Sequence, residues 1–418
     1  MSATLASALY RRLTQLELDQ ICARHDRLWQ AKPGGARAVL AYLDLSGLDF
    51  RGRNLTDADF TGCLLADADL TGARLDHSNF FGADMQGAIL ADASLRRADL
   101  RGVCLRGANL CGADLFEADL REGTIAAADK RHGLRFLEHE ARVTEARGAI
   151  LAGANLQRSK LSGVVAIRAD FSDAVMKDVK LVRANLKQAT MTGADLSGAD
   201  LSGADLEGAD LRDTVLVGAK TLQWNVSSAN LAGALTDRPV GADVSSLPYE
   251  AMLKAHAQWC ETSGKEGAPS SFEKADLRAL KSIRGFNLTA LIARGAVLYG
   301  LDMEGVQLQG AQLQGADLRN CNLRRADLRG VQLNQAKLAG ADLREAQLGP
   351  LLIAPDRLLP ANLTGASAKF VDFSGADLRR CLFTGADLER STFTGALTRQ
   401  MDVQDARLVG VKGLVLPL

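Results

Sequence analysis

The stretch Gly193–Arg212 reads GADLSGADLSGADLEGADLR, four five-residue units that differ only in their last residue. In each unit a Leu stands two residues after an Ala and directly after an Asp. A short internal repeat of fixed period is typical of a solenoid, so it must be explained before any single motif. We predict that the core of this stretch is made by Ala194, Ala199, Ala204, Leu196, Leu201, Leu206 and Leu211.

The same five-residue grid extends through most of the chain. Apolar residues, mainly Leu and Phe, recur at every fifth position, with a few lapses, from Leu45 to Ile125, from Leu151 to Leu231 and from Leu288 to Leu408. Each run is out of phase with the one before it, so the segments between them interrupt the repeat. We therefore predict three repeat arrays, at residues 43–125, 149–235 and 287–410.

A period of five fits neither a helix nor a plain strand. Helical residues advance by about 100° each, so Leu residues five apart would spread around the whole cylinder. In a strand, alternate residues face opposite sides, so an odd period would send successive Leu to opposite faces. A short extended piece followed by a turn in every unit does fit. Ala and Leu then point inward, and Gly, which tolerates positive φ, forms the corner.

With A-[D/N]-L-x-x units along most of its length, the chain resembles the pentapeptide-repeat family. The resemblance implies an all-β solenoid, namely a right-handed quadrilateral β-helix in which four units make one coil. In such a coil each inward Leu contributes about 1.5–3 kcal/mol through burial. We expect short capping helices in addition, because the ends of a solenoid must be covered.

Two segments outside the grid resemble each other and are candidates for these caps. Ile21–Phe50 and Met252–Leu280 each begin as an amphipathic helix, continue through a polar Gly/Pro stretch and enter the repeats at an Asp-Leu pair. Each helix carries a His followed closely by a Trp, and we predict that these side chains pack the cap onto the first coil. The residues concerned are His25, Trp29, His256 and Trp259.

The chain is therefore expected to contain two capped solenoid modules that meet near residues 236–247. The remaining predicted segments are a helical cap at 1–42, a non-repeat excursion at 126–148, a second helical cap and linker at 236–286, and a tail at 411–418. Within the excursion, Arg135–Val143 is compatible with strands flanking a turn or with a short helix.

Three prolines fall on corner positions of the third array. The grid continues through them at Ile353 and Leu358. Pro presets φ to about −65°, which suits some turn positions. Between an in-register coil with proline corners and a bulged loop, we favour the coil. The prolines are Pro350, Pro355 and Pro360.

No arrangement of polar residues predicts catalysis or ligand chemistry. The Asp of successive units lie on different faces, so they do not converge, and local hydrogen bonds or solvent are their expected partners. His77, His132 and His139 lack metal-ligand spacing with any Cys, and the phosphate-loop and nucleophile motifs are missing. We expect a protein that is not an enzyme and has no catalytic residue, cofactor or bound metal.

The charge and cysteine content suggest the compartment. Lys+Arg and Asp+Glu both number 50, which argues against a nucleic-acid partner. The seven Cys are scattered and form no C-x-x-C pair, as expected in a reducing compartment. No apolar run has the length of a membrane span or of a signal peptide. We therefore expect a cytoplasmic protein without membrane insertion.

One local excess of positive charge follows from the coil geometry. With four units per coil, Lys160, Lys180 and Lys220 stack on one face, interrupted by Asp200, and Arg183 lies at the next corner. These residues form a candidate basic face. A second group, which rings one coil of the third array, consists of Arg319, Arg324, Arg325 and Arg329.

The pattern as a whole favours a rigid scaffold for protein partners. The identity of these partners stays open, and so does the choice between a monomer and a homo-oligomer. The resemblance brings one alternative, because some members of the family bind DNA gyrase by mimicking duplex DNA. Such mimicry needs a strongly negative rod, usually dimerised through a C-terminal helix. The net charge here is +0, and the final residues RLVGVKGLVLPL do not look helical. A continuous acidic face would favour mimicry, whereas a mixed face favours scaffolding.

Overall fold

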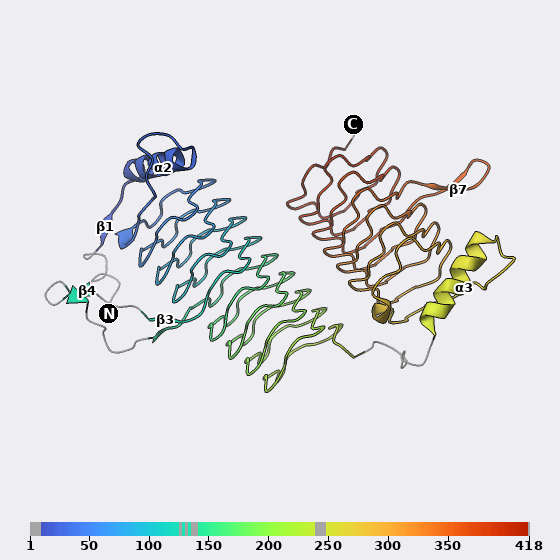
Figure 1. The fold of residues 1–418 in the computed structure, drawn as a ribbon, viewed down its shortest axis with the longest axis horizontal. Coiled ribbons are helices and arrows are strands. Elements are labelled where there is room, and N and C mark those ends of the chain that lie inside the picture. The colour runs from blue at the N-terminus through green and yellow to red at the C-terminus, as the bar shows by residue number, and fades with distance from the viewer. Residues whose placement is uncertain (1–9, 125–127, 130–132, 135–140, 239–247, 417–418) are drawn as a thin grey trace. The chain divides into compact units, whose positions relative to one another are not determined.

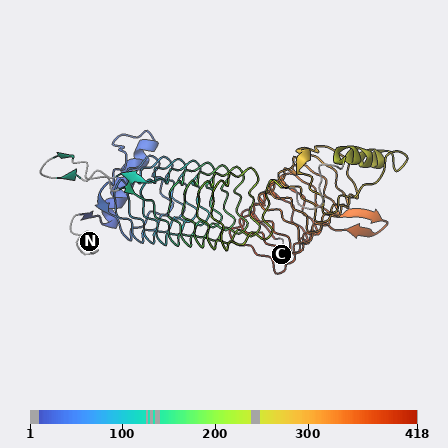
Figure 2. The ribbon, with the colours of Figure 1, turned by 90° about the horizontal axis from the view of Figure 1, so that it is seen from below.

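The computed structural model describes residues 10–124, 128–129, 133–134, 141–238 and 248–416. The chain divides into two compact units, Met1–Arg238 and Pro239–Leu418. Each unit is a stack of coils of similar outline (Figures 1 and 2). Parallel bridges join one residue of each five-residue unit to its equivalent in the next coil, for example Lys180 to Asp200 and Asp200 to Lys220. Each unit is therefore a repeat β-helix, and one regular coil consists of four five-residue units.

One side of a coil shows how the backbone hydrogen bonds are formed. The N–H of Leu201 donates to the carbonyl of Lys220 and that of Gly203 to Leu222, both at 2.8 Å and both in the next coil. The N–H of Ala204 donates to the carbonyl of Leu201 at 2.9 Å, which closes a four-residue turn. Gly203 occupies the third position of this turn with φ +67°. Such a turn requires positive φ there, which is why Gly recurs at the corners.

The core of each unit is a column of side chains from stacked coils. All seven Ala and Leu residues expected to form the core of the stretch at 193–212 are completely buried. Phenylalanines stack where they succeed one another in a column, as do Phe60 and Phe80, whose ring centroids lie 4.5 Å apart. In the second unit, Phe373 and Phe393 stack at 5.0 Å. Small Ala beside large Leu or Phe lets the coil walls close on a solid interior.

The first unit begins with a short strand and a helix. Strand β1 (Arg11–Arg12) pairs in parallel with β2 (Leu43–Asp44). Helix α2 (Gln15–Trp29) starts at a capping box, in which the Thr14 hydroxyl accepts from the Glu17 N–H and the Glu17 carboxylate accepts from the Thr14 N–H. Coils begin before the predicted boundary at residue 42, because Leu40 is already fully buried in the core.

An insertion interrupts the first unit after Leu120. Cys104 bridges to Glu145, whereas the regular spacing would bring it to Thr124, so the inserted chain leaves the stack and returns in register. Strand β3 (Gly123–Thr124) pairs antiparallel with β6 (Ala141–Arg142), and within that loop β4 (Ala128–Asp129) pairs antiparallel with β5 (Gly133–Leu134).

Strand β6 supports the strand alternative for part of the excursion. Ile125, His132 and His139 lie outside the described residues. The coils resume at Glu145, before the predicted start of the second array at 149. The early return was missed because Ala146 occupies the inward position and adds little to an apolar pattern.

The second unit begins with helix α3 (Tyr249–Glu261) and then enters its coils at Ser271. The predicted linker at 236–286 was wrong over this last part, since Phe272, Leu277 and Ile283 are buried core residues. The short 3-10 helix η2 (Arg278–Leu280) lengthens the first coil by a single position, so Ser271 bridges to Ile292 rather than to Leu291. That extra position shifts the phase and hides the coil from a strict five-residue search.

A hairpin replaces the predicted proline-cornered coil. Strand β7 (Leu351–Ala354) pairs antiparallel with β8 (Arg357–Leu359) and projects from the stack (Figure 1). Gln332 bridges to Asn362, whereas the regular spacing would bring it to Leu352, so the hairpin is an insertion. The prediction of an in-register coil was wrong. The corner positions take positive φ, as at Arg380 with +59°. Pro is locked at a φ of about −65° and cannot occupy them.

Candidate interaction surfaces

The outward Asp residues are used locally by the backbone. The Oδ1 of Asp200 accepts from the N–H of Ser202 at 3.2 Å and from its hydroxyl at 2.7 Å. These bonds, led by that of the hydroxyl, lower the pKa of Asp200. Asp195 and Ser197 repeat the arrangement. Within the described part of the chain, no group of three or more His, Cys, Asp or Glu is placed to hold a metal ion.

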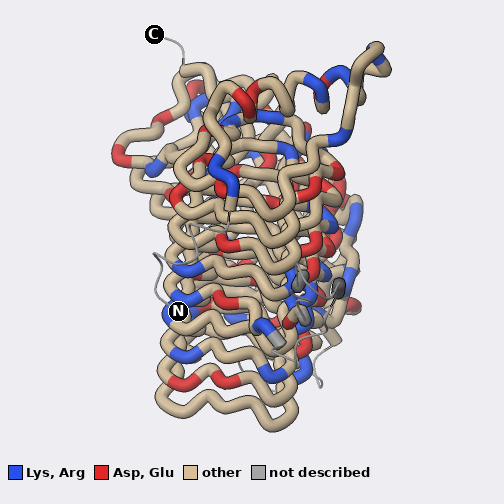
Figure 3. The backbone as a smooth tube through the Cα atoms, turned by 90° about the vertical axis from the view of Figure 1, so that its left-hand side faces the viewer, with Lys and Arg blue, Asp and Glu red and all other residues tan. Residues whose placement is uncertain are grey.

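Where the inward Leu stands between an Asp and an Arg, these two residues form an ion pair across that Leu. Asp210 and Arg212 show the geometry, with Arg212 Nε 2.9 Å from Oδ1 and Nη2 2.6 Å from Oδ2. This bidentate pairing recurs in both units. It neutralises much of the surface charge within individual sides of the coils. Basic and acidic residues are accordingly interspersed around the coils (Figure 3).

The candidate basic face is a mixed ladder. Its members are joined by successive parallel bridges, and the Nζ of Lys160 lies 3.8 Å from the Oδ2 of Asp119 in the preceding coil. Asp200 likewise stands between two lysines. Arg183 is exposed at a corner with φ +56°. Coil by coil, the ladder runs through Asp119, Lys160, Lys180, Asp200 and Lys220.

In the arginine ring of the third array, three residues form ion pairs with carboxylates, whereas the buried Nε of Arg324 has no hydrogen-bond partner among the described residues. Arg319 is buried, and its Nη2 lies 2.6 Å from the Oδ2 of Asp317. Arg325 Nε lies 2.7 Å from the Oε2 of Glu345. Arg329 pairs with Asp327 in the same way as Arg319 with Asp317. The sequence pattern located these arginines but missed their partners. For Arg319 and Arg329 the partner stands at the Asp-Leu-Arg spacing, and for Arg325 it lies in the next coil.

In both caps the histidine joins the helix to the first coil. The Nδ1 of His25 accepts from the N–H of Ala38 at 3.0 Å, and the Nδ1 of His256 accepts from the N–H of Ser270 at 3.0 Å. Since a backbone N–H can only donate, the proton of the neutral His256 ring lies on Nε2. For His256 this proton is donated to the carbonyl of Thr289 at 3.1 Å. Both rings are buried.

The tryptophans lie beside these histidines with different exposure. The rings of His256 and Trp259 have centroids 5.7 Å apart, and Trp259 is half-buried. The rings of His25 and Trp29 meet edge to face at 6.4 Å, and half of Trp29 remains exposed. Leu18 and Cys22 of α2 and Leu253 of α3 enter the cores themselves.

The cap histidines predict a pH dependence of stability. Burial lowers the pKa of both His25 and His256, because a charged ring would lose water and Nδ1 could no longer accept. Their contribution is fully present above the unfolded pKa of about 6.5 and is lost as pH falls toward the folded pKa. We expect the free energy of unfolding, measured with urea, to fall between pH 7.5 and 5.5.

The control is the double variant His25→Asn/His256→Asn, whose amide oxygens can still accept but do not titrate. It should show a weaker dependence over the same interval. An equal slope in wild type and variant would place the titrating groups elsewhere.

The β7–β8 hairpin is anchored at its root and apolar beyond it. Leu351 and Leu359 pack against Gly330, where an added Cβ would lie 2.8 Å from the Cβ of Leu351. The side-chain amide of Gln332 donates to the carbonyls of Gly330 and Pro360, at 2.9 and 3.3 Å. Three apolar side chains further out are exposed, with fractions of 66%, 44% and 41%. They are Leu352, Ile353 and Leu358.

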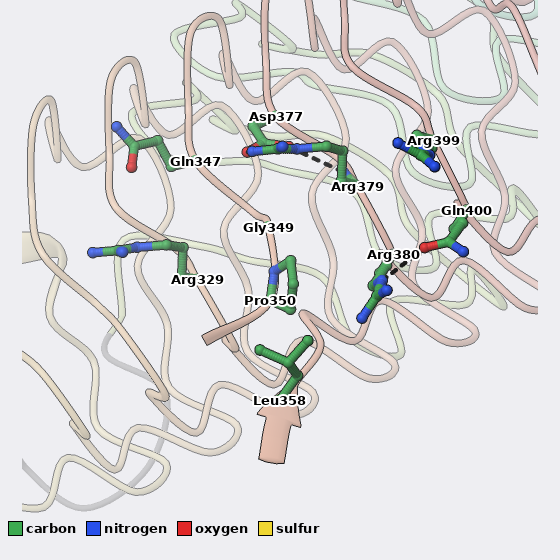
Figure 4. Close-up of a pocket in the computed structure, with 10 residues that line it drawn as sticks. All are labelled: Arg329, Gln347, Gly349, Pro350, Leu358, Asp377, Arg379, Arg380, Arg399 and Gln400. Carbon is green, nitrogen blue, oxygen red and sulfur yellow. Dashed lines mark hydrogen bonds and ion pairs between the residues drawn. The ribbon is translucent and has the colours of Figure 1, made fainter. Parts of the chain in front are cut away.

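Beside this hairpin the coils of the second unit form an open hollow of about 590 Å³ (Figure 4). Successive coils place Asp327, Gln347, Asp377 and Leu397 in one bridged ladder. The residues two positions further along therefore form a parallel column. Gly349, which has no side chain, stands between two arginines of this column and leaves the space open. The column consists of Arg329, Gly349, Arg379 and Arg399.

A family model described as pentapeptide repeats matches more than half of the chain. The chain belongs to the pentapeptide-repeat family. The matches follow the two stacks of coils and leave out helices α2 and α3 and the β7–β8 hairpin. They cover residues 44–81, 54–92, 78–116, 93–124, 146–178, 180–218, 284–320, 307–344 and 361–397.

Solved structures of pentapeptide-repeat proteins are similar to parts of this one. Rfr23 from the cyanobacterium Cyanothece 51142 is 28% identical over 32% of this chain and 86% of its own, with a TM-score of 0.24. A protein of the Arabidopsis thaliana thylakoid lumen is 30% identical over 28% and 68%, with a TM-score of 0.23. QnrB1, a plasmid-mediated fluoroquinolone resistance protein, is 20% identical over 52% and 95%, with a TM-score of 0.28.

A search of curated proteins found no match to this pentapeptide-repeat protein. Among its described helices, none has both the length and the apolar character needed to span a bilayer.

Proposed function

We propose that this pentapeptide-repeat protein is a non-catalytic, rigid scaffold that binds a protein partner, with the β7–β8 hairpin as a principal contact. We take the coils to be right-handed and quadrilateral, as in the family, and α2 and α3 to be their caps. We further propose that the protein works in the cytoplasm. The observation that carries the proposal is the anchored hairpin with three exposed apolar side chains. Their clustering on a projecting element is typical of a protein interface.

Rigidity supports the same function. Every side of a coil is tied to the next coil by backbone hydrogen bonds such as that of Leu201 to Lys220. The binding surface is therefore preformed, and it loses little conformational entropy when a partner binds. Mimicry of duplex DNA is less well supported, because the Asp of many sides is paired with an Arg two residues later and one ladder places lysines on either side of Asp200.

Affinity capture from extract of the native cell tests the scaffold. We expect the intact protein to retain a defined partner protein in stoichiometric amount. The variant Leu352→Ser/Ile353→Ser/Leu358→Ser should lose it, since each substitution removes apolar surface from the hairpin and disturbs no core. The matched control changes three exposed apolar residues elsewhere, Ile89→Ser, Ile150→Ser and Leu222→Ser. No retained partner, or equal loss in both variants, would contradict the proposal.

A further inference from the structure

The hollow beside the hairpin carries an excess of positive charge that the coils do not neutralise. Its walls contain four arginines and a single carboxylate, Asp377, together with Gln347, Gln400, Gly349, Pro350 and Leu358. Arg329 is matched by Asp327 at 2.6 Å, and Arg379 by Asp377 at 2.7 Å. The remaining two arginines, Arg380 and Arg399, lack a carboxylate partner among the described residues.

Neutral neighbours leave the charge of these two arginines in place. Arg380 Nε donates to the amide oxygen of Gln400 at 2.7 Å, a bond that orients the guanidinium but does not offset its charge. Arg399 is exposed and lies one coil beyond Arg379 in the column. Stacked coils lie about 4.8 Å apart, so the arginines of this column are spaced closely enough to bind several acceptors of one extended chain.

One wall of the hollow is apolar and leads onto the hairpin. Pro350 and Leu358 line it directly, and Leu358 keeps 41% of its surface exposed. Figure 4 shows Leu358 and Pro350 on the side of Gly349 from which the hairpin leaves, with Arg380 close by. Arginine forks suit carboxylates, and exposed Leu and Pro suit an apolar side chain.

We propose that this hollow binds an acidic protein segment, in which Asp or Glu residues flank a bulky apolar side chain. The carboxylates pair with Arg380 and Arg399, and the apolar side chain packs on Leu358 and Pro350. The volume of about 590 Å³ is that of a site for a few residues. The inference rests on the proposed scaffold function and names the chemistry of its partner. A small polyanion would use the arginines and leave the apolar wall bare.

Fluorescence anisotropy with the full-length protein tests the site. The probe is a fluorescein-labelled hexapeptide, Glu-Asp-Leu-Leu-Asp-Glu, compared with Gln-Asn-Leu-Leu-Asn-Gln and Glu-Asp-Gly-Gly-Asp-Glu. Arg380→Glu/Arg399→Glu is expected to weaken binding of the first peptide at least about tenfold, as repulsion replaces two charge pairs. Both control peptides should bind at least about fivefold more weakly to the wild type, since each lacks one class of contact.

The matched control is Arg168→Glu. Arg168 also occupies a corner with positive φ, and its Nε also donates to a glutamine oxygen one coil away, that of Gln188 at 2.7 Å. This variant should bind the peptide within about twofold of the wild type. Equal losses for Arg168→Glu and Arg380→Glu/Arg399→Glu would overturn the site, because binding would then reflect general charge.

Two further outcomes would also overturn the inference. Binding of the Gly-Gly peptide as tight as that of the Leu-Leu peptide, with displacement by inorganic phosphate, would make the hollow a simple anion site. Unchanged peptide binding by Arg380→Glu/Arg399→Glu would remove the site altogether. In either case a partner still captured through the hairpin would leave the scaffold proposal standing, so the two failures can be told apart.

Discussion

Leu201→Arg is expected to lower the free energy of unfolding of the first unit by several kcal/mol. The Leu201 side chain is fully buried in a column of apolar residues, so the guanidinium would have no partner. Such a cost is comparable with the whole stability of a typical domain, about 5–15 kcal/mol. In a stack of coils the damage spreads to nearest neighbours. Thermal and urea unfolding measure the loss, and we expect the transition of the second unit to be unchanged.

The matched control is Asp200→Lys, one residue earlier in the same unit. It removes the hydrogen bonds from Ser202 and places a third lysine between Lys180 and Lys220. We expect a cost of about 1–2 kcal/mol, because the side chain is partly solvated. A loss as large as that of Leu201→Arg would mean that inward and outward positions have been exchanged.

Phe373→Ala should cost the second unit about 3–5 kcal/mol. Phe373 is fully buried, stacks on Phe393 at 5.0 Å and meets Phe383 edge to face at 5.7 Å. Its removal leaves a cavity that the rigid coils cannot close. The comparison is Ile353→Ala on the hairpin, which should stay within about 0.5 kcal/mol of the wild type. Urea unfolding of both variants measures these costs. A cost for Ile353→Ala similar to that for Phe373→Ala would show that Ile353 lies in the core and would contradict the exposed hairpin.

The coils could be predicted from sequence because the information is local and repeated. Most sides carry their own inward Leu or Phe, a small Ala and a corner, so an error at one side does not propagate. Units with lapses, such as that at Ala166, remain in register because their neighbours on the stack hold them. The length and the phase of the arrays were harder to predict from the sequence. The extra position at η2 and the small Ala146 obscure the period where the coils begin or resume.

The hairpin shows how a pattern can mislead. Ile353 and Leu358 have the spacing of core residues, yet both are exposed. The contrary signal was the prolines, because a corner needs positive φ and Pro cannot adopt it. With the inserted hairpin left out of the count, Arg379 falls in the column of Arg329. A continuous grid would have placed Lys369 there instead, so the hollow could not be found before the hairpin was recognised.

The caps were predictable as pairs of His and Trp, but the role of the histidines was not. Their partners Ala38 and Ser270 lie 13 and 14 residues further on, and the bonds run through backbone N–H groups that carry no sequence signal. The ion pairs, in contrast, recur at the fixed Asp-Leu-Arg spacing. Charge counting alone treats Arg319 and Arg329 as part of a basic patch, whereas the coil geometry pairs each with the Asp two residues before it.

Residue-resolved amide hydrogen exchange tests the central claim most directly, namely that each five-residue unit is one side of a four-sided coil. In the unit at 201–205, the N–H groups of Leu201, Gly203, Ala204 and Asp205 all bond to backbone carbonyls, whereas that of Ser202 bonds only to the Asp200 side chain. The account predicts slow exchange broken by a faster amide at every fifth position. The faster amides in this stretch are Ser197, Ser202, Glu207 and Arg212. Uniform protection, or a minimum of any other period, would contradict the stacked coils.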